Sequence, residues 1–285
     1  MEIIRTNTLN AQQTASVKSL QTICFEHERL ANEPFLSNSL NTDPTLPCFF
    51  LLYESHRLVG FLAAFSPTED EIEVNGFVHP EYRRKGIFSS LAAEARKTYE
   101  PLFFHQMLFQ AENSSESGKA YLQKRFPHVD RSEYRLRLSK SRWEGKRPST
   151  PSKGALVEAS GEALDLFIKT ATLLLKEEAG FVQRMLGDPE RKGYLYLYDD
   201  KPLGVLQKCR EDEQLTMLYG VAIDEKFRGK GHGKAMLTLA LDVFFTSCEY
   251  LSLEVDSQNP IAFGLYRDLG FEIDFQVDYH SLILS

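Results

Sequence analysis

The chain has 285 residues, 42% of them hydrophobic and 26% charged, and a formal net charge of −7. This length suits two domains of about 100–150 residues each, and the composition is that of a globular protein. The acidic balance argues against nucleic-acid binding, which needs a basic surface.

Segments that would place the chain in a membrane or a secretory pathway are not evident in the sequence. No apolar run reaches the ~18 residues of a membrane helix, and the N-terminus lacks the pattern of a signal peptide. The four cysteines form no C-x-x-C pair and the seven histidines show no ligand spacing. We therefore expect a cytoplasmic protein with no membrane partner, no disulfide framework and no metal.

The first half of the chain alternates between helical and strand patterns. We expect helices at 15–30 and 87–99, and strands at 49–53, 58–65, 72–78 and 104–110.

The second half shows the same kinds of element in the same order. We expect a helix at 160–179 with Ser160 as its cap, strands at 194–198, 203–210, 215–223 and 250–255, helices at 235–245 and 261–269, and one or two closing strands at 271–284. The fold class that follows is α/β, with a mixed sheet flanked by helices.

A basic, glycine-rich turn, Arg228-Gly-Lys-Gly-His-Gly-Lys234, joins the apolar strand 218–223 to a helix. Glycines let the backbone approach a ligand closely, and the free amides and dipole of a helix N-terminus favour an anion. The turn is neither a Walker A sequence nor G-x-G-x-x-G. It is suited to a pyrophosphate, although a basic turn that only caps a helix is the plainer alternative.

A second motif follows the next strand. Asn259-Pro260 is a strong helix start, with an Asn cap and proline at the first helical position, and Gly270 is a typical terminator. The two motifs together, Arg-x-x-Gly-x-Gly and Asn-x-x-Ala-x-x-x-Tyr-x-x-x-Gly-Phe, resemble the GNAT superfamily of N-acetyltransferases. That resemblance implies a sheet that splays open to admit acetyl-CoA as the acyl donor.

The first half repeats the pattern. The offset that lays Arg83-Arg-Lys-Gly86 over Arg228-Gly-Lys-Gly231 also pairs Tyr121 with Tyr266 and Tyr134 with Tyr279. A repeat of this length indicates duplicated domains and not a solenoid. We therefore expect two tandem GNAT-like domains at 1–140 and 154–285, joined by a linker at 141–153 that is rich in Pro, Ser and basic residues. Trp143 is expected to pack this linker against one domain.

The resemblance implies acyl-CoA contacts at matching positions of both domains. In the second they are Val221, Ala222, Ile223, Arg228, Gly229, Lys230, Gly231, His232, Gly233, Lys234, Asn259, Ala262 and Tyr266. In the first they are Phe77, Val78, Arg83, Arg84, Lys85, Gly86, Ile87 and Phe88.

Acyl transfer to an amine also needs an acid and a base. Tyr266 is the candidate acid, because its ordinary pKa of about 10 is close to that of a thiol leaving group. A role in packing is its alternative. The base is open, because family members place it differently; Glu213 and Glu254 are the candidates, and burial would raise the pKa of the right one.

The first domain departs from the motif at one position, where Phe88 stands opposite Gly233. A bulky residue there either narrows the pyrophosphate site or points into the core and leaves the amides free. Two interpretations follow: the second domain is catalytic and the first a degenerate structural or regulatory copy, or both bind acetyl-CoA. We favour the first.

The function that follows is an N-acetyltransferase acting on a primary amine, most simply that of a small molecule, as a monomer or homodimer. A CoA-binding sensor or scaffold without catalysis, and an enzyme acting on peptide or protein amines, are the alternatives.

Overall fold

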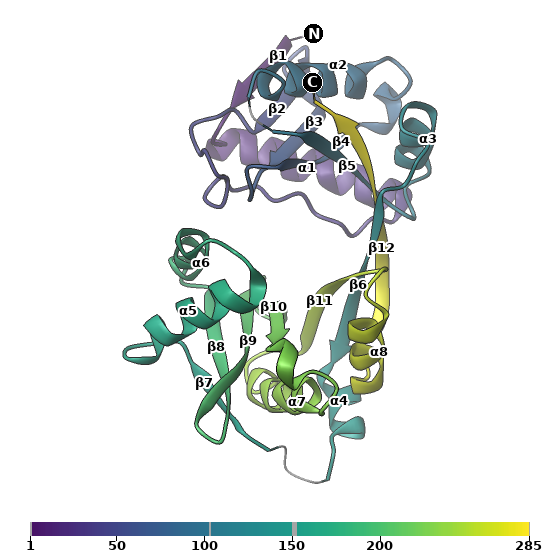
Figure 1. The fold of residues 1–285 in the computed structure, drawn as a ribbon. Coiled ribbons are helices and arrows are strands. Elements are labelled where there is room, and N and C mark those ends of the chain that lie inside the picture. Colours follow the sequence, from purple (N-terminus) through teal and green to yellow (C-terminus); the bar gives the residue numbers. More distant parts are fainter. Residues whose placement is uncertain (1, 103, 150–152, 285) are drawn as a thin grey trace. The chain divides into compact units, whose positions relative to one another are not determined.

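The computed structural model describes residues 2–102, 104–149 and 153–284. It divides into two compact units, which we call unit 1 (Met1–Ser132 with Phe275–Ser285) and unit 2 (Glu133–Asp274). Each unit is a mixed sheet covered by helices (Figure 1), so the expected α/β class is confirmed. Within the described residues, no helix is long and apolar enough to cross a membrane.

Unit 1 is built from one run of elements at the start of the chain, to which Phe275–Ser285 is added. They are β1 (Glu2–Thr6), α1 (Ala11–Glu28), β2 (Phe49–Glu54), β3 (Arg57–Phe65), β4 (Glu71–Val78), the 3₁₀ turn η1 (Pro80–Tyr82), α2 (Ile87–Tyr99), β5 (Gln106–Glu112) and α3 (Glu116–Arg125). The strands follow one another in the sheet, antiparallel except for the parallel pair β4 and β5. Two hydrophobic clusters place α1 on one face of this sheet and α2 with α3 on the other.

Unit 2 repeats this plan with added short elements. They are β6 (Arg131–Ser139), α4 (Lys140–Lys146), β7 (Ala155–Glu158), α5 (Ala163–Leu175), α6 (Ala179–Leu186), β8 (Arg191–Tyr198), β9 (Lys201–Arg210), β10 (Leu215–Ile223), η2 (Glu225–Phe227), α7 (His232–Phe244), β11 (Tyr250–Asp256) and α8 (Pro260–Leu269). The chain then ends in β12 (Glu272–Ile283), most of which belongs to unit 1. Here β10 and β11 are the parallel pair. The α5 helix covers one face, and α7 with α8 covers the other.

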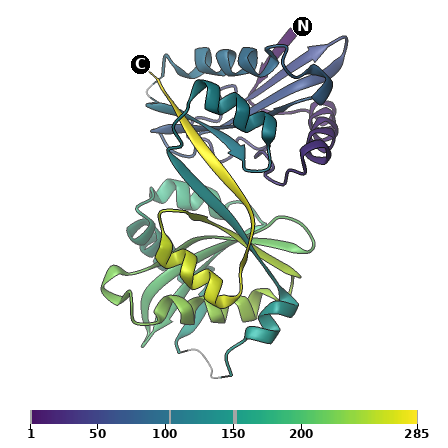
Figure 2. The same cartoon turned by 90° about the vertical axis from the view of Figure 1, so that its right-hand side faces the viewer.

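The last strand of each repeat completes the sheet of the other unit. The strand β6, which follows the first repeat, pairs antiparallel with β11, and β12, which follows the second, pairs antiparallel with β5. Figures 1 and 2 show these two long strands, β6 in teal and β12 in yellow. The compact units therefore do not follow the linear limits 1–140, 141–153 and 154–285. Those limits stay a prediction of where the repeats meet in the sequence.

The predicted helix 160–179 is wrong in its bounds. It is two helices, α5 and α6, separated by Lys176, which has a left-handed φ of 60°. Ser160 is not the cap, because Glu162 precedes the first helical residue. Gly180 lies in the first turn of α6 and not at a helix end. The closing segment 271–284 is one strand, β12.

The expected linker is partly helical. Trp143 of α4 is buried in the core of unit 2, and its indole nitrogen donates a hydrogen bond to Asp242 at 3.0 Å. Residues 150–152 of this linker lie outside the described residues. All four cysteines are free thiols.

Candidate functional site

The loop after β10 is braced to the end of its own strand. The side chain of Asp224 accepts a hydrogen bond from the amide of Lys226, which holds η2. The guanidinium Nε of Arg228 donates to the carbonyl oxygen of Ile223 at 3.1 Å. Gly229 and Gly231 then take left-handed φ angles of 72° and 87°, which other residues adopt only under strain. This geometry brings the chain from the strand end directly into α7.

The first turn of α7 is open. Gly231 precedes the helix and supplies no side-chain cap, so the first amides of α7 have no side-chain acceptor. A Cβ built on Gly229 or Gly231 would meet no atom within 4 Å. The side chain of Arg228 is 57% exposed and forms an ion pair with Glu225 at 3.6 Å. Free amides, a helix dipole and an accessible cation together make an anion cradle suited to phosphate groups.

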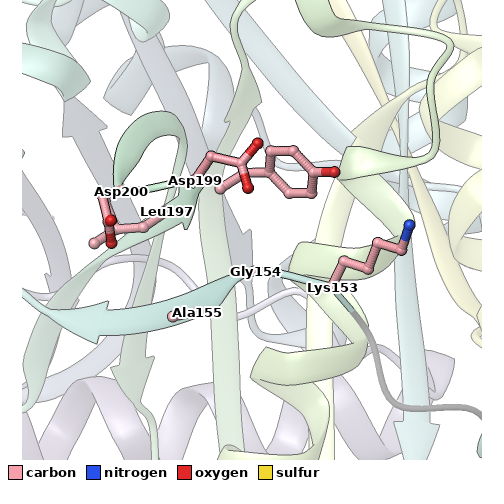
Figure 3. A pocket seen from close by; sticks show the side chains of 7 residues that line it. Lys153, Gly154, Ala155, Leu197, Asp199 and Asp200 are labelled. Carbon is pink, nitrogen blue, oxygen red and sulfur yellow. The ribbon is translucent and has the colours of Figure 1, made fainter.

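Two side chains of the loop have more specific surroundings. Lys230 donates from Nζ to the carbonyl oxygen of Lys226 at 3.0 Å. The His232 ring lies edge-on to Tyr198 with the centroids 4.8 Å apart. Tyr198 also lines a surface hollow of about 390 Å³ at the β8–β9 turn (Figure 3), with Lys153, Asp199 and Asp200 among its other walls. The hollow therefore lies beside the start of α7.

β10, the strand before the loop, diverges from β11 halfway along its length. β10 pairs with β11 only as far as Leu218. Its register with β9 shifts between Tyr219 and Ala222, and Gly220 in this bulge has a φ of 56°. Beyond the bulge, the edge of Val221 to Ile223 that faces β11 pairs with no strand in the described part of the chain. We call this divergence of β10 and β11 the splay of unit 2.

The second motif lies against the loop. Asn259 accepts a hydrogen bond from the amide of Ala262, and Pro260 starts α8, as expected from the sequence. A Cβ on Gly233 would lie 3.4 Å from Leu265, so α8 packs on the first turn of α7. Tyr266 is 6% exposed, and burial raises the pKa of its phenol to about 12. The phenol is therefore a proton donor at any physiological pH.

The corresponding loop of unit 1 has the same backbone. Arg83 donates from Nε to the carbonyl oxygen of Val78 at 3.1 Å, and Gly86 has a φ of 79°. Arg84, at the position of Gly229, accepts a left-handed φ of 65°. Phe88 points inward: its ring lies 4.8 Å from that of Tyr121, and its edge is 3.1 Å from a Cβ built on Gly76. Of the two orientations open from the sequence, the one into the core is the one observed.

A carboxylate from α1 contacts the loop of unit 1. Glu28 forms an ion pair with Arg83 at 3.2 Å and accepts hydrogen bonds from the amide and hydroxyl of Ser117 at 2.9 and 3.1 Å. It thereby links the loop after β4 to the start of α3, two elements that otherwise diverge. Phe77 and Val78, the expected contacts at the end of β4, are buried.

A second carboxylate of unit 1 binds the segment that follows α1. Glu112, at the end of β5, is 6% exposed and accepts hydrogen bonds from the amides of Ala31 and Asn32 at 2.7 and 2.8 Å. It also accepts one from the hydroxyl of Ser114. These contacts tie the segment after α1 across the end of β5. No sequence pattern indicated them, because they join residues about eighty positions apart in the chain.

The two expected bases lie at opposite ends of the β10–β11 pair: Glu213 precedes β10, and Glu254 follows the last paired residue of β11. Glu213 is exposed in the turn before β10, at the end opposite the loop. Glu254 pairs with Arg135 at 3.0 Å, and Arg135 also pairs with Glu211 at 2.8 Å. Their catalytic roles stay predictions. Among the residues described, no group of three His, Cys, Asp or Glu side chains could hold a metal ion.

Comparison with known proteins agrees with this architecture. The model of the acetyltransferase (GNAT) family matches residues 14–114 and 162–271, which together are more than half of the chain. No curated protein matches the sequence.

Several solved structures share the fold over nearly the whole chain. A GCN5-related N-acetyltransferase from Sphaerobacter thermophilus is 14% identical with a TM-score of 0.75, covering 99% of this chain and 96% of its own. A tandem GNAT protein from the clavulanic acid biosynthesis pathway is 16% identical with a TM-score of 0.73, covering 100% and 99%. Saccharomyces cerevisiae N-myristoyltransferase with bound myristoyl-CoA is 12% identical with a TM-score of 0.65, covering 99% and 82%. With the family match in both halves, the chain belongs to the acetyltransferase (GNAT) family and carries its fold twice.

Proposed function

We propose that the protein is an N-acetyltransferase whose catalytic unit is unit 2, with acetyl-CoA as donor and the primary amine of a small molecule as acceptor. One contrast carries the choice of unit. The two loops have the same backbone and equally open helix starts at Gly86 and Gly231, yet Arg83 is paired with a largely buried carboxylate whereas Arg228 is accessible. Unit 1 is then a structural partner that supplies β6 to the sheet of unit 2.

The residues of unit 2 suit the parts of an acyl-CoA in order. The amides of residues 229–234 would hold the pyrophosphate, with Lys234 and the exposed Arg228 adding charge. The unpaired edge at Val221 and Ile223 would bind the pantetheine and the thioester carbonyl. Backbone donors at such a carbonyl stabilise the oxyanion that develops as the amine attacks.

Tyr266 would protonate the departing thiolate. A buried phenol keeps its proton until it is needed, because its pKa is raised to about 12. Its position on α8, which packs against the loop helix, supports this role. We propose a cytoplasmic location for this reaction, in keeping with the four free thiols.

The test is to incubate the full chain with acetyl-CoA and a panel of primary amines: polyamines, amino sugars, amino acids and a lysine-containing peptide. Product mass and release of free CoA thiol are the readouts. We expect an N-acetylated small molecule, and no product from a Gly231→Val variant. Binding of acetyl-CoA without any acetylated amine would contradict the proposal and favour a CoA sensor. Product from the peptide alone would contradict the small-molecule acceptor.

A further inference from the structure

Buried oxygens without a protein partner gather in unit 2. Within the described residues they include Thr172 Oγ1 of α5, Glu177 Oε2, Gln207 Oε1 of β9 and Ser252 Oγ of β11. Buried polar atoms in native proteins are nearly always hydrogen-bonded, so several unpaired oxygens in one unit indicate a site that a ligand completes.

Two of these oxygens face α5. Leu206 next to Gln207, and Leu251 and Leu253 around Ser252, belong to the core beneath α7 and α8. Because side chains alternate along a strand, Gln207 and Ser252 point to the opposite face. That face lies across the sheet from α7 and α8, where the anion cradle and Tyr266 are placed.

Gln207 and the end of α5 both lie at the bulge of β10. A Cβ built on Gly220 would be 2.7 Å from Gln207 Nε2 and 3.2 Å from Leu175 Cδ1. Leu175 is the last residue of α5, and Lys176 then turns the chain with its left-handed φ of 60°. Glu177 follows immediately. The turn that carries it is therefore anchored beside the bulge.

Two cations of the neighbouring elements have other partners. Arg184 of α6 lies 5.8 Å from the Phe181 ring. Arg191 of β8 lies 5.3 Å from the Tyr219 ring and pairs with Asp188 at 3.4 Å. Of the two acids in the turn, Glu178 is exposed. Glu177 is more buried than Glu178, and burial alone raises its pKa. It is a partly buried acid that forms no ion pair with the described residues, and a raised pKa suits a general base working near neutral pH.

We propose that Glu177 is the general base that deprotonates the acceptor ammonium, on the face of the splay opposite the CoA loop. This inference rests on the proposed acetyl transfer in unit 2. It assigns the base to the turn after α5, in place of Glu213 or Glu254.

The proton balance is complete with residues of the chain. Glu177 takes one proton from R–NH₃⁺, and the free amine attacks the thioester carbon, forming the C–N bond. Collapse of the tetrahedral intermediate breaks the C–S bond, and Tyr266 gives its proton to the thiolate. The second amine proton restores Tyr266, and Glu177 releases the first to solvent. The products are the amide, CoA thiol and one proton.

The test compares Glu177→Gln with its neighbour Glu178→Gln in the full chain, using the best amine from the acceptor panel. We expect Glu177→Gln to lower kcat/KM by about 100-fold or more, within the range for general bases. We also expect it to lose the acidic limb of the pH profile and to keep the affinity for acetyl-CoA. Glu178→Gln should match the wild type in all three.

The outcomes separate the two proposals. An active wild type with Glu177→Gln within threefold of it would overturn the base while leaving acetyl transfer standing. A wild type that acetylates no amine would overturn the proposed function, and the base with it. Independently of any acceptor, a ¹³C titration of the wild-type glutamates should show Glu177 ionising above the ordinary range. An ordinary pKa at that carboxyl would also overturn the assignment.

Discussion

The Arg83 guanidinium lies 3.2 Å from the Glu28 carboxylate, in an ion pair whose two side chains are only 18% and 10% exposed. The corresponding Arg228 is 57% exposed, and its ion pair is with the exposed Glu225. Two loops of one backbone geometry therefore differ in whether their cation is accessible. This difference in accessibility, and not the larger residue Phe88, distinguishes the loop of unit 1 from that of unit 2.

The ion pair between Arg83 and Glu28 predicts that equivalent substitutions of Arg83 and Arg228 lower the free energy of unfolding by different amounts. Both arginines donate from Nε to the last carbonyl of their strand, so Arg83→Met and Arg228→Met lose this contact equally. Only Arg83→Met removes the cation from a largely buried carboxylate, which costs about 3 kcal/mol, whereas an exposed pair is worth at most ~1 kcal/mol. Urea unfolding of the two variants measures the difference. Equal losses would show that Glu28 does not depend on Arg83.

The bulge of β10 predicts a kinetic defect in Gly220→Ala. A side chain there must accept a φ of 56° and lie 2.7 Å from Gln207 Nε2, so the bulge must flatten or shift. We expect stability to fall by about 1–2 kcal/mol, since left-handed backbone costs a non-glycine residue that much. We also expect kcat/KM to fall by about 10-fold or more, because the thioester edge at Val221 moves.

The control is Gly145→Ala in α4, where an added Cβ meets no atom within 4 Å. It should leave the kinetics unchanged and stabilise the helix by roughly 0.5–1 kcal/mol. A Gly220→Ala enzyme with wild-type kinetics would show that the splay does not depend on the bulge.

Tyr266→Phe removes only the phenol oxygen from a side chain packed 5.9 Å from the Phe271 ring. If Tyr266 is the acid, kcat should fall about 100-fold while the Kd for acetyl-CoA stays unchanged. With a pKa of about 12, the wild-type phenol should produce no basic limb below about pH 10. Stopped-flow thiol release checks this. An unchanged rate in the variant, with chemistry limiting, would leave Tyr266 a packing residue.

Replacing Glu177 by a neutral residue should raise stability while it lowers activity. Burial raises the pKa of this carboxyl above that of the unfolded chain, so the folded state favours the protonated form. Its contribution to stability is therefore complete in acid, below the unfolded pKa, and is lost as the pH rises through the folded one. Glu177→Gln stays neutral and avoids this loss. Thermal unfolding should give the variant a higher Tm at pH 7.5, with the difference vanishing near pH 4; a lower Tm at pH 7.5 would contradict the burial argument.

The local features of the site were predictable from the sequence because they depend on neighbouring residues. Gly231 and Gly270 have the left-handed backbone that their turns require, and Asn259 caps α8. The repeat offset was also correct, but it did not indicate strand exchange. Tyr134 and Tyr279 correspond in the repeat, yet Tyr134 packs on Phe263 in unit 2, whereas Tyr279 lies in unit 1. Which free edge a strand joins is decided by the folded sheets and not by local pattern.

Long-range contacts account for the rest. The sequence left the direction of Phe88 open, because a rotamer is settled by partners such as Gly76 and Tyr121. Neither Glu28 nor Glu177 belongs to a motif. An acid at the end of a helix is ordinary, and only its burial in the fold distinguishes it.

Calorimetric titration of the full chain with acetyl-CoA tests most directly the claim that unit 2 alone presents an open acyl-CoA site. We predict one site per chain, abolished by Gly231→Val and unaffected by Gly86→Val, although both substitutions strain the same left-handed backbone. Two sites, or one site lost only with Gly86→Val, would show that the ligand displaces the Glu28 carboxylate from Arg83. Either result would contradict the account.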